Sequence, residues 1–363
     1  MDFSFTQEHD ELRQAIRRFL EKDSSEARVR VLMETERGYD ERTWKRMAEE
    51  LALLGLVVPE TYGGAGLGPV ELAIVMEEMG RVLFCGPYLS TAVLAVHVLL
   101  QAGTEDARSR LLPAIVSGAS IVAAAVGDAG RVKATREGAA WRLDGTCDLV
   151  IDGHVADVLL VVASVEGDVG LFEVEASASA VERTALPALD LTRKLSRVTF
   201  RGASGLRISD GDVSEALSRA TSRTVAAIAA EQAGGAQRCL EQATEYAKTR
   251  LQFGRLIGSY QAIKHKCADM LVEVEFSRSA AYYAAFRAAA GDEAEAAGAS
   301  HMAKAYVSEA FFHAAAENIQ IHGGMGFTWE HPAHLYFKRA KASAVLFGDS
   351  VGHRRELATL LGL

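Results

Sequence analysis

Two glycine-rich stretches carry residue types that suit a phosphorylated ligand. The first spans residues 246–261 (YAKTRLQFGRLIGSYQ) and leaves Arg250, Gln252 and Phe253 at the exposed end of a helical run. The second spans residues 320–326 (QIHGGMG) and falls between two later helical runs. Glycine lets backbone N–H groups approach phosphate oxygens, and arginine offers a planar, permanently charged fork. Together the two turns predict a ligand that contains a pyrophosphate and a flat ring.

Composition narrows the class of protein. The chain has 363 residues, of which 49% are hydrophobic and 24% charged, as is typical of a globular protein with two or three packed units. A net charge of −9 without a lysine and arginine cluster argues against a nucleic-acid partner. No apolar run approaches the roughly 20 residues of a membrane helix, so we expect no membrane insertion. The four cysteines lack C-x-x-C spacing and the N-terminus lacks a signal-peptide pattern, which predicts no metal site and a cytoplasmic location.

The hydrophobic period divides the chain into three segments. Helical spacing fills residues 1–119, short β-branched runs with turn signals fill residues 120–208, and helical spacing returns over residues 209–363. The pattern predicts a multi-domain α+β fold: an N-terminal helical domain, a small antiparallel β-barrel or sandwich, and a C-terminal four-helix-bundle-like domain. The expected helices are 6–22, with Thr6 as N-cap, 40–54, 70–83, 89–100, 107–117, 212–250, 260–290, 294–321, 332–346 and 350–361. The expected strands are 121–126, 132–136, 141–143, 149–151, 158–162, 170–174 and 197–200.

This order of elements, with three motifs, resembles the acyl-CoA dehydrogenase family over essentially the whole chain. The segment PETYGGAG (59–66) is similar to the family's N-terminal loop. The segments RLQFGRLI (250–257) and QIHGGMGF (320–327) are similar to its two flavin-contacting stretches. The resemblance implies an oxidoreductase that acts on CH–CH bonds, with FAD as cofactor and an acyl-CoA thioester as substrate. It also implies a tetramer built as a dimer of dimers and electron delivery to an electron-transfer flavoprotein.

The resemblance assigns a cofactor role to the two turns. In the family, FAD sits at a subunit interface, and these stretches cradle the ADP portion of a FAD held mainly by the neighbouring subunit. The matching residues here are Arg250, Gln252, Phe253, Gln320, Gly323 and Gly324, with Ile257 and Tyr260 as walls of the same pocket. For Arg250 a structural interpretation also stays open, in which its charge satisfies carbonyl groups at a helix C-terminus.

The middle segment departs from the family pattern. Where the family has a TEPxxGSD type segment, which helps to hold flavin and acyl-CoA, this chain reads AAVGDAGR (124–131). Where the family has a WITNG type strand, whose aromatic and hydroxyl residues meet the flavin ring, this chain reads LVIDG (149–153). The residues that would hold the reactive half of the flavin are therefore largely missing.

The family's general base is also missing from its usual positions. Alignment of residues 339–350 places Phe347 at the late position of the glutamate, and phenylalanine cannot accept a proton. The alternative position, early in the long helix of the C-terminal domain, is occupied by Thr224.

Two other carboxylates remain as candidate bases. Glu231 lies seven residues after Thr224 on nearly the same helix face, but roughly 10 Å further along the axis, which is more than a glutamate side chain spans. Its alternative is a helix carboxylate paired with an arginine. Asp349 lies two positions past Phe347, and its alternative is the N-cap of the last helix.

Three hypotheses follow from the contrast between the intact turns and the altered middle segment. In the first, the chain is one subunit of a heteromeric acyl-CoA dehydrogenase and completes the ADP side of a FAD held chiefly by a related catalytic chain. Such pairs occur in the family among actinobacterial enzymes for bulky substrates such as sterol side chains. In the second, the chain is a self-sufficient homotetramer with a relocated base. In the third, it is a non-catalytic structural subunit.

Overall fold

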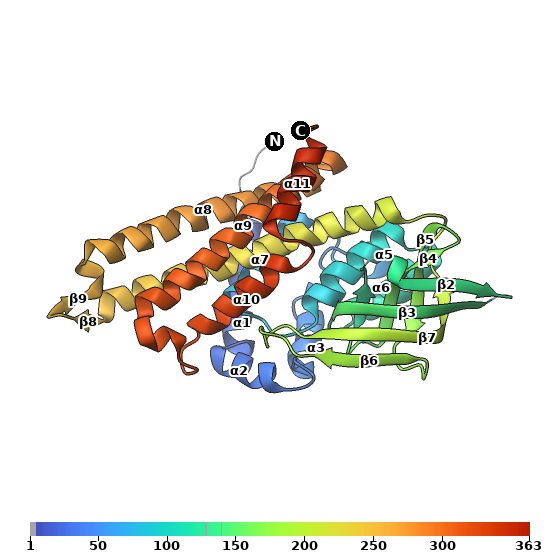
Figure 1. The fold of residues 1–363 in the computed structure, drawn as a ribbon, viewed down its shortest axis with the longest axis horizontal. Helices are drawn as coiled ribbons and strands as arrows, with labels where there is room; N and C mark the ends of the chain where they lie inside the picture. The colour runs from blue at the N-terminus through green and yellow to red at the C-terminus, as the bar shows by residue number, and fades with distance from the viewer. Residues whose placement is uncertain (1–4, 128, 139) are drawn as a thin grey trace. The chain divides into compact units, whose positions relative to one another are not determined.

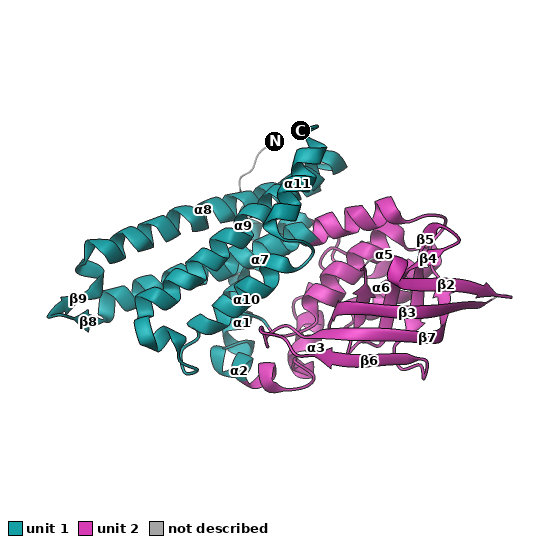
Figure 2. Ribbon diagram, viewed as in Figure 1, with its two compact units in different colours: residues 1–30, 69–84, 225–363 teal, residues 31–68, 85–224 magenta. Residues whose placement is uncertain are grey.

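The computed structural model describes residues 5–127, 129–138 and 140–363 (Figure 1). Asp128, in the 124–131 segment, lies outside the described residues. The chain forms two compact units (Figure 2). Unit 1 comprises residues 1–30, 69–84 and 225–363, and unit 2 comprises residues 31–68 and 85–224. The division into domains 1–119, 120–208 and 209–363 stays a prediction.

Unit 1 is built from long helices that run side by side (Figure 1). The N-cap of its first helix is confirmed, because the Thr6 side chain accepts from the His9 N–H and the His9 side chain accepts from the Thr6 N–H. The predicted C-terminal helices are confirmed to within two residues at each end. The helices of unit 1 are α1 (Gln7–Asp23), α4 (Pro69–Arg81), α7 (Ser214–Thr249, which starts in unit 2), α8 (Gln261–Ala290), α9 (Glu293–His322), α10 (Ala333–Val345) and α11 (Ser350–Leu360).

Adjacent glycines let α7 touch two neighbouring helices at backbone distance. A Cβ atom built on Gly234 would lie 1.9 Å from the carbonyl oxygen of Glu77 in α4, and one built on Gly80 would lie 1.9 Å from the carbonyl oxygen of Glu231. A Cβ atom on Gly235 would lie 2.5 Å from the ring of Phe311 in α9. No side chain fits at these contacts, so glycine fixes where α4, α7 and α9 cross.

Unit 2 contains shorter helices, and here some predictions are wrong. The predicted helix 40–54 ends at Glu49, because Ala52 adopts the left-handed conformation (φ 51°) and a 3-10 turn, Leu53–Gly55, follows. The helix expected at 89–100 begins as a π-helical segment, Tyr88–Ala95. The helix α2 (Glu26–Glu34), which starts in unit 1 and ends in unit 2, had no sequence prediction. The remaining elements are α3 (Glu41–Glu49), a 3-10 turn (Glu60–Tyr62), α5 (Val96–Ala102) and α6 (Glu105–Val116).

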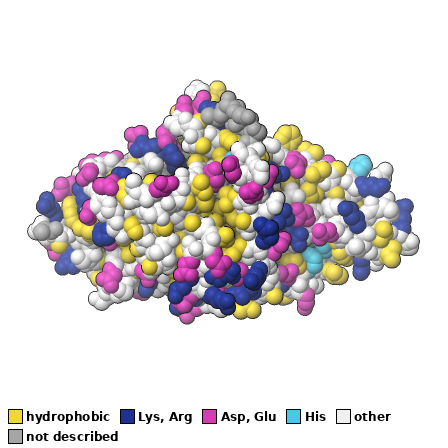
Figure 3. Space-filling model, turned by 180° about the vertical axis from the view of Figure 1, so that it is seen from behind, with side chains coloured by type: hydrophobic (Ala, Val, Ile, Leu, Met, Phe, Trp, Pro, Cys, Tyr) yellow, Lys and Arg dark blue, Asp and Glu magenta, His cyan; other side chains and the backbone are white. Residues whose placement is uncertain are grey.

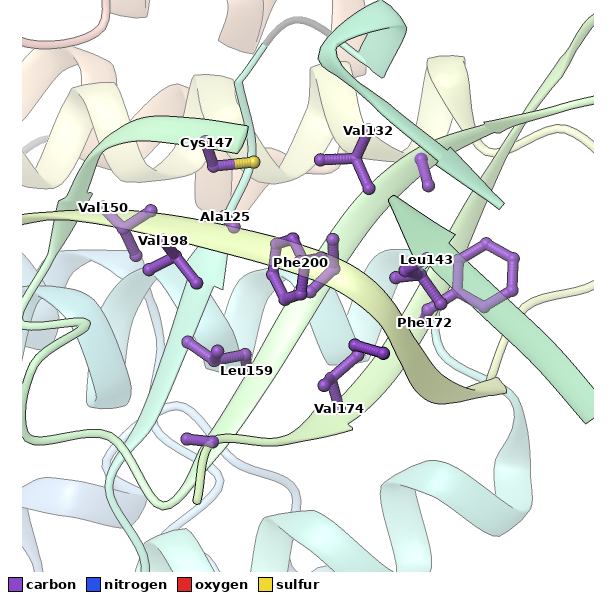
Figure 4. Packing of buried hydrophobic residues seen from close by; sticks show 14 of the residues in the cluster. Ala125, Val132, Leu143, Cys147, Val150, Leu159, Phe172, Val174, Val198 and Phe200 are labelled. Carbon is purple, nitrogen blue, oxygen red and sulfur yellow. The ribbon is translucent and has the colours of Figure 1, made fainter. Parts of the chain in front are cut away.

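The seven-stranded sheet of unit 2 is a small closed barrel. Its order is β1-β4-β2-β3-β7-β5; β5 pairs again with β4, and β6 pairs with β7. Apolar side chains such as Leu143, Phe172 and Phe200 fill its core (Figure 4). The strands are β1 (Val122–Ala125), β2 (Val132–Glu137), β3 (Ala140–Ile151), β4 (Val158–Val165), β5 (Asp168–Glu175), β6 (Val181–Leu186) and β7 (Leu195–Arg207).

Two details of the barrel correct the sequence prediction. The sheet is not purely antiparallel, because β1 runs parallel to β4 and β2 meets β4 in parallel at Lys133 and Ser164. The segment 144–146 (DGT) is not a turn between two strands. It continues β3, where Gly145 (φ 137°) pairs with Val132 and Phe200 and approaches the carbonyl oxygen of Arg131 so closely that a Cβ atom would lie 2.1 Å away. None of the helices described is long and apolar enough to cross a membrane.

We predict that Gly234→Ala destabilises the protein by about 3 kcal/mol, because the new methyl group meets rigid backbone rather than a side chain that can move. Chemical denaturation measures this change. Gly298→Ala in α9 is the matched control: the nearest atom to its Cβ would be Leu357 Cδ1 at 3.7 Å. The control variant gains about 0.5–1 kcal/mol from higher helix propensity. Equal stabilities of the two variants would contradict the assignment of the crossing point.

Candidate cofactor-binding site

The first predicted turn is a two-residue β-hairpin that follows α7. Its strands, β8 (Leu251–Gln252) and β9 (Arg255–Leu256), are joined by Phe253 and Gly254, which both have positive φ (53° and 79°). Two left-handed residues match the twist of a tight hairpin, and glycine adopts this conformation without strain. Arg250, Gln252 and Phe253 are all exposed, as the sequence predicted; the Phe253 side chain is 92% exposed.

Tyr260 fixes the base of the hairpin. Its hydroxyl donates to the carbonyl oxygen of Gln252 (3.3 Å), and the Arg255 guanidinium lies 3.9 Å above its ring. The half-buried Ile257 donates its N–H to the Arg250 carbonyl (2.8 Å). These contacts fix the backbone of the hairpin and leave the side chains of Arg250, Gln252 and Phe253 exposed.

The second predicted turn follows α9, which ends at His322. Gly323 adopts φ 63° and starts a 3-10 turn, Gly323–Phe327. A Cβ atom at Gly323 or Gly324 would meet no atom within 4 Å, whereas one at Gly326 would lie 2.9 Å from the Ile319 carbonyl. The turn thus has a packed side and an open side, and Gln320 is exposed one helical turn before it.

Tyr246 brings the two turns together at one end of unit 1 (Figure 1). Its ring stacks on His322 (4.3 Å between centroids), and its hydroxyl lies 3.9 Å from the Met325 sulfur in the second turn. Basic and hydrophobic side chains both gather at the end that carries the hairpin (right in Figure 3). The exposed apolar residues here are Leu251, Phe253, Leu256, Met325, Phe327 and Trp329.

These features fit the ADP half of a dinucleotide such as FAD. An exposed glycine backbone and a guanidinium suit a pyrophosphate, amide side chains suit the polar edges of the nucleotide, and the exposed apolar side chains offer a wall for a flat ring. Sequence reasoning missed Tyr246, His322 and His331 as parts of this site. The sequence signals were that Tyr246 opens the first glycine-rich stretch and that His322 lies within the second.

The strand segment 149–153 of unit 2 does not fit the reactive half of a flavin. Leu149 is 59% exposed, but its side chain is purely apolar, and Ile151 is buried. Asp152 is buried as well, and it accepts a hydrogen bond from the Ser90 hydroxyl (2.7 Å). The segment therefore offers no free side-chain hydrogen-bond donor to a ring.

A hollow of about 480 Å³ lies beside this segment. Asp148 bridges Arg197 (2.5 Å) and Arg131 (3.0 Å) across it, and the hydrogen bond from Arg197 is the main reason that the pKa of Asp148 is lowered. The charged groups of the hollow thus bind one another. Its other lining residues are Gly127, Cys147, Leu149 and Leu186.

The two candidate carboxylates both have structural partners. Glu231 is buried and forms an ion pair with the equally buried Arg339 (Nη1 to Oε1, 2.7 Å), which also donates to the Phe84 carbonyl. Asp349 caps α11, because its side chain accepts from the Gly352 N–H (2.8 Å). Both carboxylates thus have the structural partners described above as alternatives, and a role of either as a base stays a prediction.

The two usual base positions hold no carboxylate. Phe347 is half-buried in a left-handed conformation (φ 59°) between α10 and α11. Thr224 is buried in unit 2, where its hydroxyl donates to the Ala220 carbonyl (2.9 Å) and lies 3.4 Å from His97 Nδ1. Burial lowers the pKa of His97 to about 3, so this imidazole is neutral at physiological pH.

The chain thus combines a small barrel with a helical bundle whose end carries two exposed glycine turns. The sequence profile of the acyl-CoA dehydrogenase N-terminal domain matches residues 6–119, and that of the C-terminal domain matches residues 216–361. The chain is 37% identical to the acyl-CoA dehydrogenase IpdE2 of Mycobacterium tuberculosis over 94% of its own length and 93% of that protein. The chain belongs to the acyl-CoA dehydrogenase family, in which FAD is the cofactor.

Two solved structures share the whole fold. The ChsE4–ChsE5 complex from Mycobacterium tuberculosis superimposes with a TM-score of 0.91 and 29% identity, covering 100% of this chain and 99% of that one. A variant of the Tcur3481–Tcur3483 steroid ACAD gives a TM-score of 0.89 and 29% identity, covering 98% of both chains. These similarities and the family profiles confirm the predicted family, fold class and cofactor.

We predict that Arg339→Met destabilises the protein by about 3–5 kcal/mol, because it leaves the buried Glu231 carboxylate without its cation. The double variant Arg339→Met/Glu231→Gln regains more than half of this loss in denaturant unfolding. The exposed pair Arg354–Glu309 is the matched control, and Arg354→Met costs at most about 1 kcal/mol. A double variant as unstable as Arg339→Met would show that the charge of Glu231 is not the cause.

Proposed function

We propose that this chain is one subunit of a heteromeric acyl-CoA dehydrogenase, in which it supplies the ADP side of a FAD site held chiefly by a related catalytic chain. One contrast carries the proposal. In the two turns of unit 1, Arg250, Gly254, Gly323 and Gly324 are exposed, whereas the polar groups beside strand segment 149–153 are buried or paired with one another. The chain can therefore cradle phosphates, but it offers little to a reacting ring.

The similar proteins support a complex of two related chains. The names of both solved structures contain two gene products, ChsE4–ChsE5 and Tcur3481–Tcur3483, and the second is called a steroid ACAD. This supports a partner that is itself an acyl-CoA dehydrogenase, and a substrate whose acyl group carries a bulky ring system. The electron acceptor we propose is an electron-transfer flavoprotein, and the location we propose is the cytoplasm.

Each residue of the cradle has a distinct task in this proposal. The Gly323 N–H already donates to the Gln320 carbonyl, so in this proposal the Gly324 N–H donates to the phosphate oxygens. The Arg250 guanidinium neutralises their charge. The side-chain amides of Gln252 and Gln320 bind the polar edges of the nucleotide. The apolar and aromatic residues Phe253, Ile257 and Tyr260 exclude water from one face of the nucleotide.

The chemistry itself is assigned to the partner subunit. In this family FAD supplies the hydride acceptor for α,β-dehydrogenation of an acyl thioester, and a carboxylate removes the α-proton. The carboxylate of Glu231 is held by Arg339 and that of Asp349 by the first turn of α11, so neither is free to move to a substrate. We therefore place the base on the partner.

We predict that the purified chain is colourless when it is expressed alone, and that it forms a yellow complex when it is expressed with the related chain encoded beside it. In that complex Arg250→Ala weakens FAD binding by about 10–100-fold, because a charge-assisted hydrogen bond is lost. Visible absorbance after gel filtration measures the retained flavin. Arg355→Ala, an exposed charge on α11, is the control and leaves retention unchanged.

The same experiment separates the other two hypotheses. Stoichiometric FAD and dehydrogenase activity in the chain alone would support the self-sufficient homotetramer, and a loss of that activity in Glu231→Gln or Asp349→Asn would identify its base. Unchanged flavin retention in Arg250→Ala would support a purely structural subunit.

A further inference from the structure

Three rings form a continuous column beneath the two cofactor-contacting turns of unit 1. The Tyr246 ring stacks on the His322 ring with 4.3 Å between centroids and 27° between planes. The His322 ring in turn lies 4.2 Å from the His331 ring, at 43°. Tyr246 comes from α7, His322 ends α9 and His331 precedes α10, so the column joins three helices. Rings at these distances attract one another in offset geometry.

The residues of the column adjoin both turns. At its first end, the Tyr246 carbonyl accepts the N–H of Arg250 (2.9 Å), which starts the hairpin segment. The Tyr246 hydroxyl lies 3.9 Å from the Met325 sulfur in the second turn. In the middle, His322 is covalently joined to Gly323. The Tyr246 ring thus lies one helical turn before Arg250 and the His322 ring directly before Gly323, at the points where the two turns begin.

The hydrogen bonds of both histidines define their tautomers. Nδ1 of His322 lies 2.8 Å from the Asn318 carbonyl, so this nitrogen carries the proton and donates. Nδ1 of His331 lies 3.2 Å from the Ala333 N–H, at the start of α10, so this nitrogen accepts and carries no proton. A doubly protonated His331 would lose this acceptor and would place a positive charge against His322. The column as built requires His331 to be neutral.

The surroundings favour neutral rings. Burial is the main cause that lowers the pKa of both His322 and His331, and for His331 the charge of His322 is the second cause. The other charged groups around His331 are Glu26 and Arg30 from α2, and His334 from α10; Glu26 alone opposes the shift. Arg30 also donates to the carbonyls of Trp329 (2.6 Å) and Glu330 (3.1 Å), which fixes the segment before His331.

We propose that Tyr246, His322 and His331 are positioning residues that hold the two turns in register for the ADP moiety of FAD. The inference rests on the proposed function, in which these turns form one side of a shared FAD site. It adds that affinity for the cofactor depends on residues that do not touch it, and that this affinity declines in acid as the column is protonated.

Four single variants of the complex with its partner subunit test the column. Tyr246→Leu removes a ring, and Tyr246→Phe keeps the ring but removes the hydroxyl. His331→Asn removes a ring but keeps a side-chain acceptor for the Ala333 N–H, and His331→Phe does the reverse. Dissociation constants for added FAD are measured at 10 °C by quenching of flavin fluorescence, with thermal unfolding recorded in parallel.

We expect the two ring-removing variants to weaken FAD binding about three- to tenfold, and the two ring-keeping variants to stay within about twofold of the parent. The double variant Tyr246→Leu/His331→Asn weakens binding by less than the product of its parts, because either loss already frees His322. FAD affinity unchanged in the ring-removing variants, or lowered equally in all four, overturns the proposal. A lower unfolding temperature with unchanged FAD affinity shows that the column serves stability alone.

The pH profile supplies a second readout. Because the folded-state pKa values of both histidines lie below the ordinary value of 6.5, the folded column is favoured above that pH and loses stability as the pH falls below it. FAD affinity of the parent complex therefore declines below about pH 6.5, and the decline is shallower in His331→Phe. Identical profiles of these two proteins overturn the proposal.

Arg250→Ala, measured in the same titration, separates this inference from the proposed function. If Arg250→Ala leaves the dissociation constant unchanged, the turns do not bind FAD and the proposed function fails. If Arg250→Ala weakens FAD binding while the ring-removing variants do not, only the positioning role of the ring column is refuted.

Discussion

The crossing of α4 and α7 is the constraint on which the rest of unit 1 depends. Gly80 and Gly234 bring the two backbones into contact at Glu231 and Glu77. The carboxylates of these two residues contact other helices. Glu231 forms an ion pair with Arg339 of α10. Glu77 accepts hydrogen bonds from Tyr282 of α8 (2.5 Å) and from Arg13 of α1. A single crossing therefore ties five helices together, and Gly235 adds α9 through Phe311.

This arrangement explains how the chain can retain buried carboxylates without an exposed base. A carboxylate in an apolar interior is tolerated only with a cation and hydrogen-bond donors, and each of these groups has them. Glu231 lies on the helix face where a base would be sought, but its charge stabilises the crossing. The cost of moving it toward a substrate would include leaving Arg339 unpaired in the interior.

Sequence patterns predicted the helices and turns well where the cause is local. Thr6 and Asp349 each accept a hydrogen bond from a backbone N–H three residues later, and the two glycine turns follow from residues a few positions apart. The predictions failed where contacts with a segment distant in the sequence determine the local structure. Gly145 lies between two predicted strands, yet it is a paired residue of β3 that packs against the Arg131 carbonyl, and β1 pairs in parallel with a strand more than thirty residues later. The ring column escaped prediction for the same reason, because residues 246, 322 and 331 meet only after α7 and α9 have packed.

The exposed apolar side chains around the hairpin have a consequence for how the protein is made. Phe253, Phe327 and Trp329 place large hydrophobic areas in water at one end of the bundle, next to the short exposed strands β8 and β9. Exposed apolar surfaces and strand edges of this type associate with other apolar surfaces, including those of further copies of the same chain. In the proposed complex the second subunit covers them, so synthesis of the two chains in equal amounts protects this one from self-association.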